Sequence, residues 1–234
     1  MGSLKVALMT AVGVVMFGFC TANADDDVRW VSPTGDDAKD GLAKTTADEL
    51  KVGGEIGRHL DLTVRKVLRH TDVERDFLRF FRNRVPSEGR LRDCEQAGGP
   101  YRGFVGYGMF LDGVVKACAR GIGGAELKAF KDKALADLIA TQGKDGSISV
   151  FTSIPKGNIV WDHRAVWDNH ESAYILQALA NDYLAFGTRT SREAAVRLAD
   201  HMMEREEGLN IGCETAFVLV GQATKDPKYR DWLE

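Results

Sequence analysis

The sequence predicts an all-α protein that forms part of an (α/α)6 toroid, in which inner and outer helices alternate along the chain. Apolar residues recur at helical spacing, and segments that are apolar on nearly every side alternate with segments that have one apolar stripe. Inner helices of a ring contact protein on every side, whereas outer helices face water. We count about three helical pairs, roughly half of a six-hairpin ring. A plain helical bundle is the structural alternative.

The composition fits one sizeable hydrophobic core and a partner of low charge. The chain has 234 residues, of which 44% are hydrophobic, and its 31 basic residues nearly balance 34 acidic ones. A formal charge of -3 provides no basic surface for nucleic acid or for an anionic membrane. The sequence also lacks a glycine-rich phosphate loop, zinc-finger spacing and a nucleophile elbow.

Residues 1–24 have the pattern of a secretory signal peptide. Lys5 precedes a continuous apolar run, and the small residues Ala22 and Ala24 provide a cleavage site. A membrane anchor is the alternative, but the run is short for a bilayer span. We therefore expect a secreted or periplasmic protein that has no membrane contact after cleavage.

Cleavage after Ala24 determines the predicted domain organisation. Residues 25–54 are polar with little periodicity and are expected to form a leader. Residues 55–234 are expected to form the folded domain, a truncated α/α barrel.

Three cysteines remain in the mature chain. Cys20 lies in the signal peptide, which leaves Cys94, Cys118 and Cys213. An odd number permits at most one internal disulfide, so the chain is not a small disulfide-stapled scaffold.

Helical periodicity begins at about residue 55. The stretches EIGRHLDLTVRKVLRH and VERDFLRFFRNR share an apolar face that comprises Ile56, Leu60, Val64, Val67 or Leu68, Phe77, Phe80 and Phe81. The sequence VPSEG then ends the helical pattern, because proline and glycine extend a helix poorly.

The next segment, EQAGGPYRGFVGYG, is rich in glycine and aromatic residues and predicts an irregular loop. Residues 109–119 are mostly apolar, and Asp112 and Lys116 are one helical turn apart, where they can pair. The stretch GAELKAFKDKALADLIATQ has a single apolar stripe and is ended by the turn GKDGS. Residues 148–166 predict a long connection, and such loops in compact domains are often functional.

A buried helix is predicted to start near Asn169, in the sequence DNHESAYILQALANDYLAF. Asn169 can cap this helix, and the helix dipole favours Glu171 in the first turn. The one-sided stretch TSREAAVRLADHMMERE follows, with a capping box formed by Thr190 and Glu193. The last long stretch, ETAFVLVGQAT, is again apolar on nearly every side.

Four segments, taken in order, resemble the N-terminal half of glycoside hydrolase family 127, the β-L-arabinofuranosidases, formerly a domain of unknown function. They are GGEIGRHLDLTVRKVLRHTDVERDFLRFFRNR, GMFLDGVVKACARGIGGAELKAFKDKALADLIATQGKDGSISVF, DNHESAYILQALANDYLAFGTRTSREAAVRLADHM and ETAFVLVGQATKDPKY. The likeness spans residues 53–229, and DNHE before an apolar helix is its most specific element.

The resemblance implies both a fold and a sugar site. In the family, the corresponding Asn-His-Glu lies at the mouth of an (α/α)6 barrel, and its histidine faces the sugar. Asn169, His170 and Glu171 would accordingly line the substrate site, with His170 hydrogen-bonded to a furanose hydroxyl. From the residues alone, a purely structural helix cap is the alternative interpretation.

The sequence departs from the family at a second place. Where members usually have His-Pro-Glu-Ile-Glu, this chain has NIGCE, which keeps only Glu214 as a substrate-binding candidate. Family members use a cysteine nucleophile held on zinc by further cysteines and a glutamate, and a second glutamate as acid/base; these lie in the later part of the barrel. We therefore expect a fragment that lacks the catalytic residues. No cofactor is expected in this segment, and zinc is expected only in the full-length domain.

Other polar residues have less specific chemistry. Cys213 has no cysteine neighbour and is expected to be a small buried hydrophobe. Asp162, His163, Asp168 and His170 lack the helical spacing of metal ligands and are expected to form hydrogen bonds, so no metal site is predicted.

These observations predict a secreted, glycoside hydrolase-like protein that acts on or binds L-arabinofuranose-type plant glycans. The expected partner is a carbohydrate. A noncatalytic glycan-binding or scaffold protein is one alternative, and a different α/α-toroid carbohydrate enzyme, such as a polysaccharide lyase, is another. Ordinary glycoside hydrolysis by Glu171 and Glu214 would depend on the distance between their carboxylates.

Overall fold

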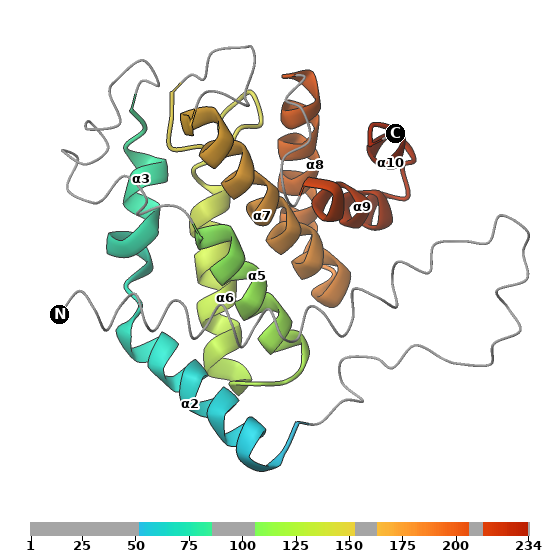
Figure 1. Ribbon diagram of the computed structural model, residues 1–234. Helices are drawn as coiled ribbons and strands as arrows, with labels where there is room; N and C mark the ends of the chain where they lie inside the picture. Colours follow the sequence, from blue (N-terminus) through green and yellow to red (C-terminus); the bar gives the residue numbers. More distant parts are fainter. Residues whose placement is uncertain (1–51, 86–105, 153–162, 206–212, 234) are drawn as a thin grey trace, which may run out of the picture. The chain divides into compact units, whose positions relative to one another are not determined.

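The computed structural model describes residues 52–85, 106–152, 163–205 and 213–233 (Figure 1). The chain divides into two compact units, residues 1–59 and 60–234, and the packing described below lies within the second. The described residues of this unit are helical apart from turns, connecting segments and one isolated parallel bridge between Val85 and Phe151. The all-α prediction is therefore confirmed.

The predicted signal peptide, residues 1–24, and most of the predicted leader, residues 25–54, lie outside the described residues. The described elements, in chain order, are α2 (Gly54–His70), the π-helical turn η2 (Glu74–Leu78), α3 (Arg79–Arg82), α5 (Tyr107–Ala119), α6 (Gly124–Ile139), α7 (His163–Phe186), α8 (Arg189–Glu204), α9 (Cys213–Thr224) and α10 (Lys228–Asp231).

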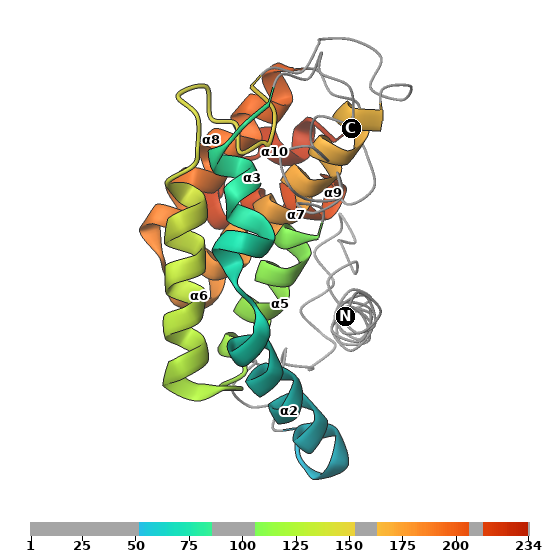
Figure 2. The same cartoon turned by 90° about the vertical axis from the view of Figure 1, so that its left-hand side faces the viewer.

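The long helices form two layers. Helices α5, α7 and α9 lie side by side and form an inner layer, while α6 and α8 form an outer layer that covers one face of it (Figure 2). Helix α7 is central, because it contacts α5 and α9 within its own layer and α8 in the other. Successive helices thus alternate between the two layers from α5 to α9.

The burial of α7 follows from this central position. Six of its apolar residues are completely buried, namely Ala173, Ile175, Leu176, Ala178, Leu179 and Ala180. Alanines at three of these positions leave room for neighbouring helices to approach closely. The outer helix α8 instead buries one face, formed by Ser191, Ala194, Ala195, Leu198, Ala199 and Met202, and exposes charged residues elsewhere.

Helices α5 and α7 touch through their backbones at Gly108. A Cβ atom added to Gly108 would lie 2.4 Å from the backbone nitrogen of Ile175, which is closer than real Cβ atoms approach other atoms. Next to this contact, the ring of Tyr107 stacks on Phe77 at a centroid distance of 4.8 Å. The contact fixes the spacing of the two inner helices, so a side chain at position 108 would force them apart.

A buried ion pair joins the two layers. Lys131 of α6 pairs with Asp182 of α7, and both residues are completely buried. Ser191 of α8 donates a hydrogen bond to the second oxygen of Asp182 at 2.6 Å. The Lys131 ammonium also lies 2.8 Å from Asp132 and 4.4 Å from the centroid of the Phe186 ring. One carboxylate thus ties three helices together.

Two helix starts differ from the sequence prediction. Helix α7 begins at His163, so Asn169 does not cap it and Glu171 is not in its first turn. The four polar residues from Asp168 to Glu171 obscured the helical pattern, yet three of them are buried. Helix α8 begins at Arg189 after Thr188, so Thr190 and Glu193 do not form a capping box. Glu193 instead accepts a hydrogen bond from Arg189 at 2.7 Å.

We predict that Lys131→Met lowers the free energy of unfolding by about 3–5 kcal/mol, because it leaves Asp182 charged and buried without its cation. Urea denaturation measures the loss. The matched control is Lys128→Met on the same helix, where Lys128 and Asp132 form an exposed pair at 2.8 Å. That control is expected to cost less than about 1 kcal/mol. Equal losses for the two variants would contradict the role of the buried pair.

Candidate functional site

The residues singled out by the sequence lie within the first half of α7, at Asp168, Asn169, His170 and Glu171. Successive residues of an α-helix point about 100° apart, so neighbouring side chains here face different elements. Because α7 has α5 on one side and α9 on the other (Figure 1), its polar residues meet both neighbours.

Glu171 binds the start of α5. Its two oxygens accept hydrogen bonds from the N–H groups of Gly106 at 2.6 Å and Gly108 at 2.5 Å, and the residue is 1% exposed. The N–H groups at the start of a helix have no acceptor within that helix, and the dipole favours a negative charge there. Glu171 is therefore a helix cap, but it caps α5 and not its own helix.

Asp168 holds the segment that follows α6. It is 5% exposed, and one of its oxygens accepts a hydrogen bond from the Ser149 hydroxyl at 2.6 Å. The oxygen of Ser149 accepts in turn from the N–H of Phe151 at 2.9 Å. In the same segment, Ser172 of α7 donates to the carbonyl of Ile148 at 3.4 Å. This part of the predicted long connection is thereby fixed against α7.

Asn169 faces the start of α9. Its Oδ1 atom accepts a hydrogen bond from the thiol of Cys213 at a donor-to-acceptor distance of 3.7 Å. Asn169 is 2% exposed, and its Nδ2 atom has no hydrogen-bond partner within the part of the chain that the structure describes. The carboxamide of Asn169 has two polar atoms, an oxygen and a nitrogen, and the single thiol of Cys213 binds only one of them. In either orientation of the carboxamide, the other polar atom can bind another group.

His170 is half-buried, and its neighbours in the sequence, Asn169 and Glu171, are both buried. Its ring meets Tyr174 edge-on, with the ring centroids 4.8 Å apart. Burial lowers the pKa of His170, so the imidazole is uncharged at neutral pH. A neutral imidazole offers one hydrogen-bond donor and one acceptor, which is a combination suited to a hydroxyl group.

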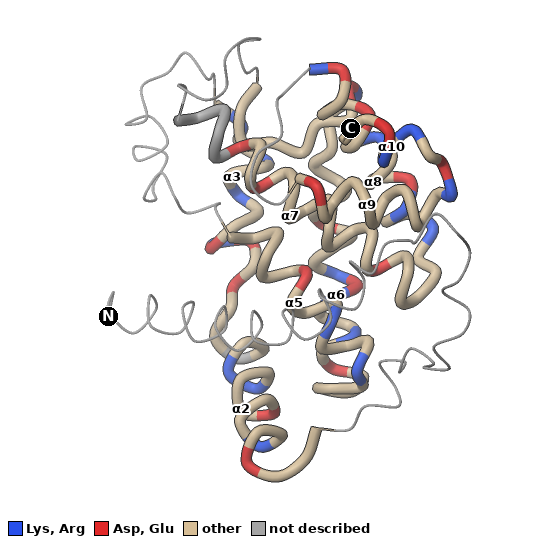
Figure 3. Tube along the Cα trace, turned by 45° about the vertical axis from the view of Figure 1, so that its right-hand side comes forward, with Lys and Arg blue, Asp and Glu red and all other residues tan. Residues whose placement is uncertain are grey.

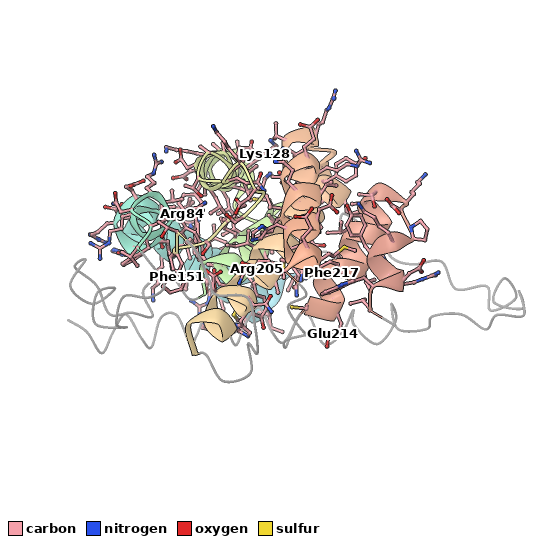
Figure 4. All side chains as sticks on the ribbon, turned by 90° about the horizontal axis from the view of Figure 1, so that it is seen from above. Arg84, Lys128, Phe151, Arg205, Glu214 and Phe217 are labelled. Atoms are coloured by element: carbon pink, nitrogen blue, oxygen red, sulfur yellow. The ribbon has the colours of Figure 1, made fainter. Side chains whose placement is uncertain are left out.

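Glu214 is exposed in the first turn of α9, next to Cys213. In Figure 4 it projects from the start of α9 away from the neighbouring helices. The structure therefore brings Glu214 to the end of the helix that Asn169 contacts. Glu171 instead faces α5, on the other side of α7, so the two glutamates do not form a facing carboxylate pair.

Burial changes the proton affinity of both acids on α7. It raises the pKa of Glu171 to about 7, against the opposing effect of the hydrogen bonds from Gly108 and Gly106. It raises the pKa of Asp168 to about 6, although the hydrogen bond from Ser149 acts in the opposite direction. In both cases the loss of hydration outweighs the local hydrogen bonds.

The zinc-thiolate site of the resembled family is expected only in the full-length domain, and not among the described residues. Among them, no three histidine, cysteine or acidic side chains gather closely enough to hold a metal ion. Cys118 and Cys213 lie on different helices, α5 and α9. Cys213 is 1% exposed, in agreement with its prediction as a buried hydrophobe. The predicted pair of Lys116 and Asp112 is also confirmed, at 2.8 Å.

The partners of the acids on α7 are not evident from the sequence pattern. Asp162 lies outside the described residues, and no side-chain position is described for His163. Ser149, Gly106 and Gly108 gave no signal by themselves, because the hydrogen bonds that they make connect positions more than a dozen residues apart. The glycine of the sequence YG, Gly108, is the residue at which α5 approaches the backbone of α7. The sequence does not identify Glu171 as the acid that binds there.

Comparison with known proteins identifies no relative, since no protein family, curated protein or solved structure matches the chain. Over the described ranges, no helix is long and apolar enough to cross a membrane. Acidic and basic residues are interspersed along the described trace (Figure 3).

We predict that Glu171→Ala destabilises the protein by about 2 kcal/mol or more, because two N–H groups at the start of α5 lose their acceptor. Urea denaturation at neutral pH gives the change. Glu214→Ala is the matched control; as an exposed residue, it should alter stability by no more than about 0.5 kcal/mol. A similarly small effect of Glu171→Ala would show that Glu171 does not support α5.

Proposed function

We propose that this chain is a secreted glycan-recognition domain of the family 127 type, which binds L-arabinofuranose-type sugars where the first half of α7 meets the start of α9. The signal peptide predicted at residues 1–24 and the ordered resemblance over residues 53–229 provide the starting point. The proposal assigns recognition to this chain. It assigns no nucleophile and no acid/base to any of its residues.

The layered arrangement supports the toroid part of the proposal. Alternation of α5, α7 and α9 with the outer helices α6 and α8 is the arrangement that consecutive hairpins of an (α/α)6 ring adopt. In such a ring, polar residues near the ends of inner helices line the mouth, where a ligand can reach them. Asn169, in the first half of α7, contacts Cys213, the first residue of α9, and Glu214 follows Cys213 in the first turn of that helix.

The observation that carries the proposal is the spare polar atom of Asn169. A buried amide group without a hydrogen-bond partner lowers the free energy of unfolding by about 1–3 kcal/mol. A ligand or a water molecule that binds the second polar atom of Asn169 would remove this penalty. A sugar hydroxyl both donates and accepts, which matches an amide beside a neutral imidazole and a carboxylate. The proposed ligand contacts are therefore Asn169, His170 and Glu214.

Glu171 has a supporting role in this proposal. The sequence suggested that it lines the sugar site together with Asn169 and His170, but both of its oxygens accept hydrogen bonds from α5. We therefore propose that Glu171 positions the helix on which the other two residues lie. Its contribution to binding would be indirect.

The proposal predicts that methyl β-L-arabinofuranoside binds to the purified chain and that His170→Ala weakens this binding at least tenfold, by removing a hydrogen bond to the sugar. Isothermal titration calorimetry measures both affinities. Gln222→Ala, at an exposed position near the other end of α9, is the control and should bind as the native chain does.

Two results would contradict the proposal. The first is the absence of binding to arabinofuranosides by a folded protein, which would favour the scaffold alternative. The second is an unchanged affinity of His170→Ala for the arabinofuranoside, which would indicate that the DNHE segment has a purely structural role. Release of an unsaturated product from an acidic polysaccharide, detected by ultraviolet absorbance, would instead identify a lyase.

A further inference from the structure

The thiol of Cys213 and the carboxamide of Asn169 form a buried polar contact between α9 and α7. Cys213 is the first residue of α9, and Asn169 lies in the first half of α7. The two residues are 1% and 2% exposed, and the Sγ atom of Cys213 lies 3.7 Å from the Oδ1 atom of Asn169. Since water is excluded from both groups, the groups around the carboxamide decide which of its ends faces α9.

We infer that Cys213 is a positioning residue for the proposed sugar site. Its thiol holds the oxygen of the Asn169 carboxamide against α9, so that the amino group of Asn169 faces the ligand and donates to a hydroxyl oxygen of the sugar. The inference rests on the proposed binding of an arabinofuranoside, and it adds the direction of one hydrogen bond. It assigns Cys213 no contact with the sugar.

The start of α9 favours this orientation of the carboxamide. The N–H groups in the first turn of a helix have no acceptor within that helix, and the aligned dipoles give this end a partial positive charge. The carboxamide oxygen carries a partial negative charge, and the S–H group of Cys213 can donate to it. In the reversed orientation, the positively polarised amino group would face the positive end of α9.

The amino group is then the part of Asn169 that remains for a ligand. Its Nδ2 atom is buried and has no hydrogen-bond partner among the residues that the structure describes. An amino group has two donors and no acceptor, so it binds an oxygen atom whether or not that oxygen carries a proton. A sugar hydroxyl that accepts from Asn169 therefore keeps its own proton for a second contact.

Fluorinated sugars test the direction of this hydrogen bond. Fluorine in place of a hydroxyl accepts a hydrogen bond weakly and cannot donate one, whereas a deoxy sugar can do neither. The probes are each monodeoxy derivative of methyl β-L-arabinofuranoside and the matching monofluoro derivative, measured by isothermal titration calorimetry. At one position, the fluoro derivative should bind at least about threefold more tightly than the deoxy derivative, and this preference should disappear in Asn169→Leu.

Two substitutions of Cys213 separate positioning from packing. Cys213→Ser keeps a donor for the oxygen of Asn169 and should retain the fluoro preference. Cys213→Ala removes the donor and lets the carboxamide turn, so it should weaken binding of the parent sugar at least about threefold and reduce the fluoro preference at least about twofold. A role in packing alone predicts that serine, the more polar of these two small side chains, is tolerated no better than alanine.

Cys118→Ala is the matched control, because Cys118 is a partly buried thiol on α5 and not on α7 or α9. It should leave the affinity and the fluoro preference unchanged.

Three outcomes of the binding experiments are distinguishable. Equal affinities of the fluoro and deoxy derivatives at every position, while the parent sugar still binds, would overturn the inference and leave the proposed function intact. Binding by Cys213→Ser that is no better than binding by Cys213→Ala would also overturn it. A folded chain that binds no arabinofuranoside would contradict the proposed function itself, and with it the donation to a sugar.

The S–H stretching band in the infrared spectrum tests the orientation of the carboxamide without a ligand. A thiol that donates a hydrogen bond absorbs at a lower frequency than one that does not, and the band of Cys213 is the one that Cys213→Ser lacks. In Asn169→Leu an apolar side chain of similar shape replaces the acceptor, so this band should move to higher frequency. An unchanged frequency would show that the thiol does not donate to Asn169 and would overturn the inference.

Discussion

The fold depends on the burial of the middle of α7, a helix that is not completely apolar. Helix α7 is enclosed by α5, α8 and α9, yet it carries Asp168, Asn169, Glu171 and Asp182 at buried positions. Water is excluded from these groups, so each must find its hydrogen bonds in another element. The polar residues of α7 therefore determine which segments lie against it, in addition to the apolar contacts that drive the packing.

The buried polar groups of α7 differ in how many of their possible hydrogen bonds they form. Asp182 has both a cation and a hydroxyl as partners, and Glu171 has two N–H groups. Asn169 has one thiol for a carboxamide that can make several hydrogen bonds. The carboxylates of Asp182 and Glu171 therefore stabilise the fold, whereas the carboxamide of Asn169 can still bind another group, although Asn169 and Glu171 belong to the same DNHE segment.

The sequence predicted the all-α character and most of the helices, because helical periodicity records which face of each segment is buried. It predicted the start of α7 poorly, since periodicity treats Asp168 to Glu171 as a surface or a cap. Their partners at Ser149, Gly106 and Cys213 are brought to them only by the tertiary fold. For the same reason, the sequence indicated that DNHE is important but did not reveal that Glu171 serves a different helix from its own.

The close contact at Gly108 also limits how the inner layer can move. Backbones that touch without intervening side chains have no compressible layer between them, so α5 and α7 cannot slide along each other without a clash at Ile175. The outer helix α6 is tied to α7 by the ion pair of Lys131 with Asp182, and the long side chain of Lys131 has several rotatable bonds. In larger conformational changes of this unit, α5 and α7 should therefore move together as one rigid body. The other helices should be displaced relative to this pair.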